Sequence, residues 1–211
     1  MLKTSNSNNS HLGDKGIILA SQSPRRKQLL EWAEVPFEII VADTDESYPV
    51  NLPVEEIAVY IARNKALAVR QQLLEGFKTL QELPPILAAD TIVILQNEII
   101  GKPTNREDAV NILSRLSGNH HKVITGVVIL NKEEEISFAD VTYVEFNTLT
   151  KEQIEFYVDK YKPYDKAGAY AIQEWIGVVG IKTINGDFYN VMGLPVSRVV
   201  RVINNLVMDN E

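Results

Sequence analysis

An apolar run near the middle of the chain, ILAADTIVIL at residues 86–95, constrains the fold more than any other segment. A strand with one solvated face alternates apolar and polar side chains. This run is nearly all apolar instead, which predicts a strand that is buried on both faces. A second, shorter strand is expected directly after it, before residue 103. We therefore expect the chain to fold around a covered sheet.

Helical and strand patterns alternate along the rest of the chain, which predicts a mixed α/β fold. Strong helix formers from Val54 to about Leu80 indicate one long helix that breaks near Gly76. No internal repeat or low-complexity linker interrupts the pattern, and a two-lobed sheet with a cleft fits it. Further helices are expected at 23–35, 104–117, from 150 and at 194–207, strands at 16–21, 37–43, 121–130 and 136–146, and a hairpin around Asn185 and Gly186.

Two helix starts carry the side-chain pattern of a capping box. In this motif the hydroxyl of the first residue accepts a hydrogen bond from the backbone N–H of an acid or amide residue three positions later. The side chain of that later residue accepts a hydrogen bond from the backbone N–H of the first. Thr104 with Glu107 fits the first box, and Thr150 with Gln153 fits the second. Gly118 stands where the helix after Thr104 would stop, because glycine readily adopts the left-handed conformation that ends helices.

Composition and charge exclude several classes of protein. The 211 residues include no cysteine, which excludes a disulfide scaffold and a thiolate metal site and favours a cytoplasmic location. The net charge of −7 argues against a nucleic-acid partner, although a local basic pocket for a small anion remains compatible with it. No apolar run is long enough for a membrane span, and residues 1–15 are expected to form a disordered polar extension without a signal sequence.

The segment ASQSPRR, which follows the first expected strand, predicts an anion site. Ser23 is a good N-cap and the next residue is proline, so a helix should start directly after the strand. Free backbone N–H groups at that start, together with Ser21, Arg25 and Arg26, suit a phosphate group. A plain capped helix with solvated arginines stays open as the alternative.

Carboxylates in two segments suit a base or a metal ligand. Asp90 is expected at the end of the buried strand, where a charge is costly unless it is paired, and Thr91 follows it. A general base or a Mg²⁺ ligand would explain Asp90, and a turn-forming or capping aspartate is the alternative. Glu46 lies in an acidic loop with Asp43 and Asp45, which could bind a divalent cation beside a polyphosphate or could simply be solvated.

Three lysines and one glutamine are further candidates for ligand contacts. Lys65, Lys102 and Lys166 suit phosphate groups, and the alternative for each is an ordinary surface lysine. Gln173 could read a base edge, because an amide both donates and accepts hydrogen bonds, or it could be a polar cap. The small residues at 167–169 would allow the backbone to approach a ligand closely.

Other conspicuous residues do not predict a site. His120 and His121 are adjacent in an expected strand and so should point to opposite faces, and this spacing argues against a zinc site. Trp32 and Trp175 are expected to be packing residues rather than to stack on a base.

Eight segments together resemble the Maf family of nucleotide pyrophosphatases. They occur in the family's order and extend over most of the chain from about residue 17 to residue 205, so residues 16–211 are expected to form one Maf-like domain. The segments are LASQSPRR, DES, RNKA, AADTIV, GKP, LSGNHHKVITGV, DKAGAYAIQ and NVMGLP.

The resemblance implies a fold similar to the inosine triphosphate pyrophosphatases, with a central cleft between two lobes. It implies hydrolysis of a nucleoside triphosphate to the monophosphate and pyrophosphate with a divalent cation, Mg²⁺ or Mn²⁺. By position, the family's proton acceptor matches Asp90, its phosphate-binding residues match Ser21, Arg25 and Arg26, its acidic metal-side residue matches Glu46, and its lysines match Lys65 and Lys102.

The family branch that acts on dTTP and UTP is similar to this chain at three specificity positions, Arg25, Thr91 and Gln173. Glu174 departs from the pattern, because a glycine is common there. A homodimer is expected only through the resemblance. Two other functions remain open: a nucleotide-binding regulator of cell division without significant turnover, and a hydrolase of non-canonical purine nucleotides.

Overall fold

The computed structural model describes residues 16–76 and 79–208, so the polar extension expected at 1–15 lies outside the described residues. The mixed α/β class predicted from the alternating pattern is confirmed. In chain order the elements are β1 (Ile17–Leu19), α1 (Pro24–Trp32), β2 (Phe37–Ile39), α2 (Val54–Leu74), η1 (Leu80–Glu82), β3 (Ile86–Leu95), β4 (Glu98–Ile100), α3 (Arg106–Leu116), β5 (His120–Asn131), β6 (Glu134–Phe146), α4 (Lys151–Tyr161), η2 (Ala167–Ala169), α5 (Trp175–Gly180), β7 (Ile181–Asn185), α6 (Phe188–Met192) and α7 (Val196–Met208).

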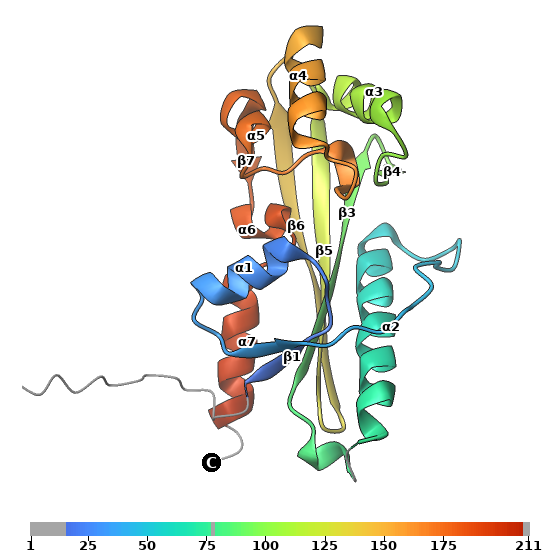
Figure 1. The fold of residues 1–211 in the computed structure, drawn as a ribbon, viewed down its shortest axis with the longest axis vertical. Helices are drawn as coiled ribbons and strands as arrows, with labels where there is room; N and C mark the ends of the chain where they lie inside the picture. Colours follow the sequence, from blue (N-terminus) through green and yellow to red (C-terminus); the bar gives the residue numbers. More distant parts are fainter. Residues whose placement is uncertain (1–15, 77–78, 209–211) are drawn as a thin grey trace, which may run out of the picture.

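One mixed sheet with the strand order β2-β1-β3-β5-β6-β7 forms the centre of the protein. The long strands β3, β5 and β6 run through the length of the molecule, and β5 is antiparallel to its neighbours β3 and β6 (Figure 1). β1 and β4 pair with the same strand, β3, at its two ends. β1, β2 and α2 therefore belong to one lobe, and β4, α3, α4, α5 and β7 to the other (Figure 1).

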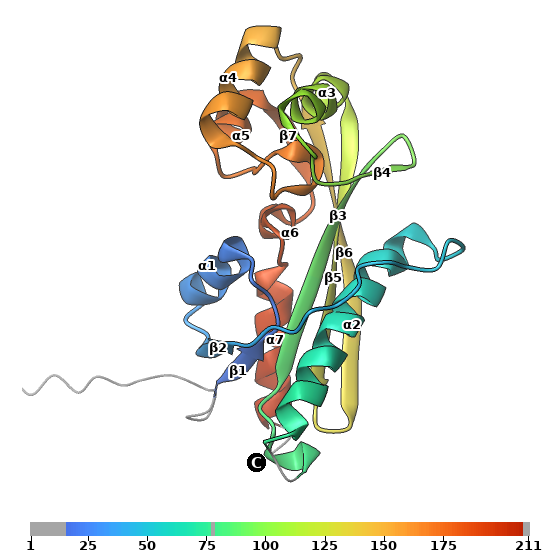
Figure 2. The same cartoon turned by 45° about the vertical axis from the view of Figure 1, so that its right-hand side comes forward.

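Helices cover both faces of the sheet, as the apolar run at 86–95 predicts. α2 lies alone on one face, while α1, α6 and α7 lie on the other (Figure 2). Ala62, Ala66 and Val69 of α2 pack against Ala88 of β3, and all four are buried. On the opposite face Leu87 belongs to the largest buried cluster. The pleat alternates side chains between the faces, so a strand within this sandwich is apolar at almost every position.

Several element boundaries follow the sequence signals. Thr150 and Gln153 form the predicted capping box of α4, with both reciprocal hydrogen bonds present. Gly118 follows α3 with a φ of 70°, as expected for a glycine that ends a helix. The long helix α2 ends at Leu74, close to the predicted break near Gly76.

The first predicted capping box is wrong by one residue. The N-cap of α3 is Asn105, whose side chain accepts a hydrogen bond from the backbone N–H of Asp108 at 2.9 Å. Thr104 instead donates both its backbone N–H and its hydroxyl to the Asp108 carboxylate. Asparagine caps a helix at least as well as threonine does, so the N-cap moves one position along the chain.

The hairpin expected at Asn185 and Gly186 is also wrong. β7 ends at Asn185 and pairs with β6, and the chain then enters α6, whose N-cap is Asp187. Gly186 has a φ of 131°, and a Cβ there would lie 2.7 Å from the Thr142 hydroxyl. The glycine thus serves a close approach to the neighbouring strand rather than a turn between two strands.

The two tryptophans differ from each other. Trp175 contacts Phe156 edge-on, with ring centroids 4.9 Å apart, as expected for a packing residue. Trp32 is 58% exposed at the end of α1, so more than half of this expected packing residue stays uncovered. Within the described residues, none of the helices combines the length and apolar character needed to cross a membrane.

Candidate active site

A pocket of about 460 Å³ opens at a gap in the edge of the central strand. β1 pairs with β3 only as far as Leu87, and β4 begins to pair with β3 at Val93. Between these points, over residues 88–92, neither neighbouring strand covers that edge of β3. Side chains from both faces of the strand can therefore reach one pocket, and Asp90 and Thr91 both line it. This is the central cleft that the sequence predicts.

Asp90 lies in the middle of β3, not at the end of a strand as predicted. The strand continues for five residues beyond it, because the apolar pattern resumes at Ile92. The carboxylate is tolerated there because it is paired: its Oδ1 accepts a hydrogen bond from Lys65 Nζ at 2.7 Å. Both side chains are largely but not fully buried at the pocket wall.

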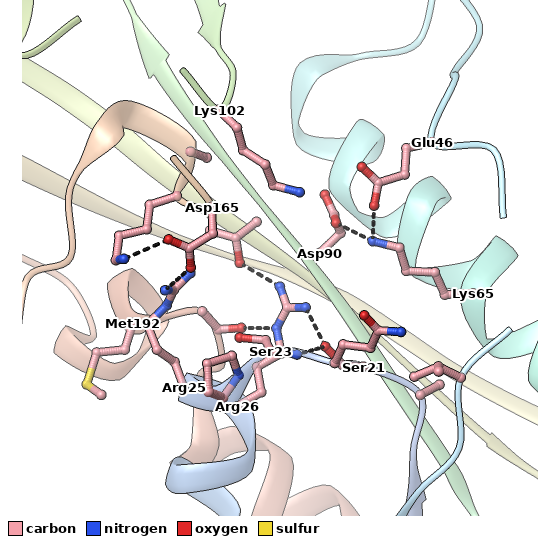
Figure 3. A pocket seen from close by; sticks show the side chains of 18 of the residues that line it. Ser21, Ser23, Arg25, Arg26, Glu46, Lys65, Asp90, Lys102, Asp165 and Met192 are labelled. Carbon is pink, nitrogen blue, oxygen red and sulfur yellow. Dashed lines mark hydrogen bonds and ion pairs between the residues drawn. The ribbon is translucent and has the colours of Figure 1, made fainter. Parts of the chain in front are cut away.

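Lys65 joins two carboxylates that are far apart in the sequence. Its Nζ lies 2.7 Å from Asp90 Oδ1 and 2.7 Å from Glu46 Oε1 (Figure 3). The hydrogen bond from Lys65 holds the pKa of the Glu46 carboxyl below its usual value, and Lys102 and Arg26 lower that pKa further through their charge. The acidic loop is therefore not merely solvated, because its glutamate reaches the same point as Asp90.

Gly126 lets α2 approach the sheet closely enough for this contact. It pairs with Asp90 in the register of β3 and β5 and faces α2. A Cβ at this position would lie 2.2 Å from the carbonyl carbon of Ala58 and 2.2 Å from the backbone nitrogen of Val59. Lys65 follows Ala58 by seven residues, about two turns, and so lies on the same side of the helix. The glycine thus helps to place Lys65 beside Asp90.

The start of α1 forms a second wall of the pocket, directly after β1. Ser23 occupies the N-cap position and Pro24 the first helical position, as predicted, but the Ser23 side chain makes no capping hydrogen bond. Ser21 is almost fully buried, and its hydroxyl accepts hydrogen bonds from Ser23 N at 3.3 Å and from Arg26 Nη1 at 2.9 Å. These side chains give the segment 21–26 a defined shape before any ligand is present.

Arg26 organises the floor of the pocket. Besides its bond to Ser21, its Nε donates to the Gly193 carbonyl at 2.8 Å and its Nη2 donates to the Thr91 hydroxyl at 3.1 Å (Figure 3). Burial lowers the pKa of its guanidinium, although arginine keeps its charge in proteins. Two of its five N–H groups have no role in these bonds. Arg26 therefore brings positive charge to the pocket while it ties together β1, β3 and the loop after α6.

Arg25 connects the two lobes across the pocket. Its Nη1 lies 3.2 Å from Asp165 Oδ2, and the same aspartate binds Lys166 Nζ at 2.7 Å (Figure 3). Asp165 precedes η2 and was not anticipated from the sequence, because an aspartate before a lysine has no distinctive spacing. Lys102, after β4, points its amine toward Asp90 from the same lobe (Figure 3).

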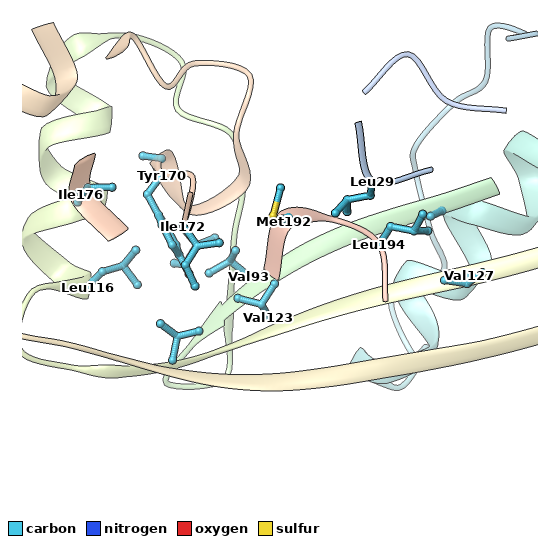
Figure 4. Close-up of a cluster of buried hydrophobic side chains, with 14 of the residues drawn as sticks. Leu29, Val93, Leu116, Val123, Val127, Tyr170, Ile172, Ile176, Met192 and Leu194 are labelled. Atoms are coloured by element: carbon cyan, nitrogen blue, oxygen red, sulfur yellow. The ribbon is translucent and has the colours of Figure 1, made fainter. Parts of the chain in front are cut away.

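The pocket has an apolar side as well. Val93 and Val123 are paired across β3 and β5, and both line the pocket with Met192 and Tyr170. These four side chains also belong to the main buried cluster, whose labelled residues in Figure 4 extend from one lobe into the other. Charged groups at one end and an apolar surface at the other would suit a ligand with a polyanionic part and a flat ring.

The Thr91 hydroxyl lies between Arg26 and Thr125, and Thr125 continues a chain of hydrogen bonds through the sheet. Its hydroxyl lies 2.9 Å from the Thr125 hydroxyl, which donates to the Asn190 carbonyl at 3.0 Å. The Asn190 amide in turn donates to the Val123 carbonyl at 3.1 Å and to the Thr142 hydroxyl at 2.9 Å. Asn190, in α6, therefore pins the segment that carries Met192 against the sheet. Thr125 and Asn190 were not predicted as functional residues, because only the folded sheet brings them to Thr91.

Gln173 is the one predicted site residue that does not line the pocket in the described structure. Its side chain is exposed, whereas Ala171, two residues earlier, lines the wall. The neighbouring Glu174 occupies the N-cap position of α5 without a capping hydrogen bond, and its side chain accepts a hydrogen bond from the Tyr157 hydroxyl and lies 3.7 Å from Lys166 Nζ. The unusual glutamate therefore has a structural partner in α4.

The other predicted site residues line the pocket: Ser21, Arg25, Arg26, Glu46, Lys65, Asp90, Thr91 and Lys102.

The donor set at Asp90 and Glu46 fits a hard divalent cation. Their oxygens converge on one amine, and Mg²⁺ commonly takes only one or two carboxylates when a substrate phosphate supplies further oxygens. The described residues contain no cluster of three or more histidine, cysteine or acidic side chains that could enclose a metal by themselves.

His121 is buried and His120 is exposed, so the prediction that they face opposite ways is confirmed.

Comparison with known proteins identifies the family. The family described as Maf-like protein matches residues 16–206. The chain belongs to the Maf family. Among its curated relatives, the Maf-family chain is 50% identical over 190 residues to a dTTP/UTP pyrophosphatase of Cytophaga hutchinsonii, with 90% of this chain and 84% of that protein covered. Proteins of the same name from Parabacteroides distasonis and Bacteroides thetaiotaomicron are 47% and 48% identical, with 90% of this chain and 95% of each protein covered.

Among solved structures, a HAM1 protein from Coxiella burnetii matches the Maf-family chain with a TM-score of 0.47 and 15% identity. The match covers 90% of this chain and 99% of that one.

Proposed function

We propose that this protein hydrolyses dTTP and UTP to the nucleoside monophosphate and pyrophosphate. The observation that carries the proposal is the convergence of Asp90 and Glu46 on Lys65, at 2.7 Å each, in a pocket that also holds Arg25 and Arg26. Membership of the Maf family and the printed names of its relatives support the same activity. We expect the enzyme in the cytoplasm. The homodimer implied by the family resemblance is tested by measuring the mass of the protein in solution.

The positive charges of the pocket would bind the triphosphate. Five cationic side chains line the pocket even though the whole chain has a net charge of −7, so the positive charge is local. The start of α1 adds backbone N–H groups and the positive end of the helix dipole. Because these groups are already held in place, they can stabilise charge that develops in the transition state without reorganising. The cations are Arg25, Arg26, Lys65, Lys102 and Lys166.

Asp90 is the residue we assign as proton acceptor. In hydrolysis between the α- and β-phosphates, water attacks phosphorus, its proton passes to the Asp90 carboxylate, and pyrophosphate leaves. A base must lie within hydrogen-bonding reach of the attacking water, and Asp90 faces the pocket from the uncovered edge of β3. Lys65 holds the carboxylate through its 2.7 Å hydrogen bond, and its positive charge would attract the substrate phosphates.

Glu46 and Asp90 would hold a divalent cation, Mg²⁺ or Mn²⁺. Such an ion polarises phosphate oxygens and lowers the pKa of bound water. Lys65 pairs with the same two carboxylates, and its positive charge reduces the repulsion between them. Thr91 and Arg25 would contribute to the choice of nucleotide, and the fact that both line the pocket supports this. Gln173 would have to turn inward to contribute as well.

The test is release of pyrophosphate from dTTP, UTP, CTP, GTP, ITP and 7-methyl-GTP, with Mg²⁺ or Mn²⁺ present. We expect turnover on dTTP and UTP and a loss of about 10²- to 10⁴-fold in Asp90→Asn, the usual range for removal of a general base. Asp45→Asn is the matched control, because Asp45 lies one residue from Glu46 and, among the described residues, its carboxylate accepts hydrogen bonds from Ser47 alone. It should keep wild-type activity.

Two results would contradict the proposal. Nucleotide binding without turnover on any of these substrates would support a regulator instead. Fast turnover on ITP with none on dTTP or UTP would support a hydrolase of non-canonical purines.

A further inference from the structure

The two hydroxyl groups of Thr91 and Thr125 form a hydrogen-bond chain whose direction is fixed. Thr125 Oγ1 lies 3.0 Å from the Asn190 carbonyl oxygen and 2.9 Å from Thr91 Oγ1, and the residue is fully buried. A carbonyl oxygen can only accept, so the single hydroxyl proton of Thr125 must point to Asn190. If it did not, two oxygens would lie 3.0 Å apart in the interior with no proton between them.

The direction of this chain decides what Thr91 can offer to a ligand. Because the proton of Thr125 is used on Asn190, the contact between the threonines can be filled only by the proton of Thr91. Arg26 Nη2 donates to Thr91 Oγ1 at 3.1 Å and, as a guanidinium, cannot accept. One lone pair is all that the Thr91 hydroxyl has left. Thr91 thus lines the pocket as a hydrogen-bond acceptor that cannot donate.

We propose that Thr125 is a positioning residue for nucleotide selection, because it fixes the Thr91 hydroxyl as an acceptor for the ring N3–H of thymine and uracil. The carbonyl groups of these two bases only accept, so N3–H is the base donor that they share. Cytosine carries an unprotonated acceptor at N3, which would face the lone pair of Thr91. The proposal rests on the function proposed above, in which Thr91 contributes to the choice of base.

Thr125→Val tests the proposal, because valine has the shape of threonine but no hydroxyl. The Asn190 carbonyl keeps its hydrogen bond from Gly193 N at 3.0 Å, so the substitution leaves that oxygen paired. In the variant the proton of Thr91 is free to turn into the pocket, where it can donate to N3 of cytosine. We expect the ratio of kcat/KM for CTP to that for UTP to rise about tenfold, the effect of roughly one hydrogen bond. Thr125→Ser keeps the hydroxyl and should restore the wild-type ratio.

A merely structural role for Thr125 predicts a different result. Loss of packing would lower turnover of both nucleotides together and leave the ratio unchanged, and that outcome would overturn the proposal. The ratio is measurable only if the wild type cleaves UTP, so failure of the proposed function appears as no turnover in the wild type.

A second measurement needs no variant and so does not depend on whether Thr125→Val folds. The wild-type enzyme is given N3-methyl-UTP, with 5-methyl-UTP as the control that carries a methyl group elsewhere on the ring. We expect 5-methyl-UTP to be cleaved like UTP and N3-methyl-UTP to be cleaved at least about tenfold more slowly, because N3 can no longer donate. Equal cleavage of all three would overturn the proposal.

Discussion

His121 is a buried polar residue whose protonation the folded protein resists. Its Nε2 lies 2.7 Å from the hydroxyl of Tyr170, which lines the pocket, and its Nδ1 has no hydrogen-bond partner among the described residues. The ring also packs against Phe146 and edge-on against Tyr170. Burial, and to a lesser extent the charge of His120, lowers the pKa of His121 to about 4. Tyr170 in the pocket wall is therefore hydrogen-bonded to an imidazole that stays neutral at physiological pH.

This lowered pKa predicts how stability depends on pH. As pH falls from about 6.5 to 4, the unfolded chain takes up a proton at His121 while the folded chain does not, so the free energy of unfolding falls. The loss should reach up to about 3 kcal/mol by pH 4. His121→Phe keeps a ring between Phe146 and Tyr170 and should remove this part of the pH dependence in urea titrations at several pH values. His120→Phe, at an exposed position, should leave it in place; equal slopes in both variants would contradict the assignment.

Among the elements, α2 and β5 meet more closely than side chains would normally allow. Gly126 makes the approach possible, and the approach carries Lys65 to Asp90. The position of one helix over one strand thus sets the distance between two functional groups. A change in that packing should affect folding and catalysis together.

Gly126→Ala should show this coupling. Its Cβ would meet the backbone of α2 at 2.2 Å, and backbone cannot move aside as a flexible side chain can. We expect the free energy of unfolding to fall by about 1–3 kcal/mol, the usual cost of overpacking, and kcat to fall as Lys65 is displaced. Gly101→Ala is the matched control for stability, because a Cβ there has no atom within 4 Å. Chemical denaturation of both variants gives the comparison, and equal stability of the two would show that α2 can shift freely.

The elements themselves were largely predictable, because apolar periodicity and capping residues act locally. The capping box at Thr150 and the buried run at 86–95 each follow from a few neighbouring residues. The errors have physical causes that lie outside such windows. Asp90 could be placed mid-strand only once Lys65, 25 residues away, was known to pair with it. The role of Gly186 depends on contact with Thr142 across the sheet.

The site was predictable to the extent that single segments carry it. Ser21, Arg25 and Arg26 lie in one segment whose residue types already suit an anion. Asp165, Thr125 and Asn190 enter only through the three-dimensional arrangement, since each acts on a residue at least 34 positions away. Gln173 was predicted but does not line the pocket, because a segment match places a residue near the pocket without fixing the direction of its side chain.

At the scale of the whole molecule, the two lobes are joined across the pocket by opposite charges. Arg25 of α1 pairs with Asp165 at 3.2 Å, so an incoming triphosphate has to compete with a carboxylate for that arginine. The pair is partly exposed, and pairs of this kind contribute little to stability. Its main effect should therefore fall on ligand binding.

Asp165→Asn should bind a non-hydrolysable dTTP analogue more tightly, by about threefold to tenfold, because Arg25 no longer loses a partner when phosphate binds. Asp159→Asn removes the partner of Arg106, an exposed arginine–aspartate pair that does not line the pocket, and should leave the affinity unchanged. Isothermal titration calorimetry measures both. Weaker binding in Asp165→Asn would indicate that this carboxylate contacts the nucleotide itself.

The pleat of β3 sends Asp90 toward α2 and Thr91 toward α6, although the two residues are adjacent in the chain. With the roles proposed for Asp90 and Thr91, reaction chemistry and nucleotide choice would belong to opposite faces of one sheet, with different supporting helices. An engineer, or natural selection, can alter the threonine side of the strand to admit a new base while the aspartate side continues to cleave the same anhydride bond. The single uncovered stretch of β3 thus makes substrate range and catalytic step separately adjustable.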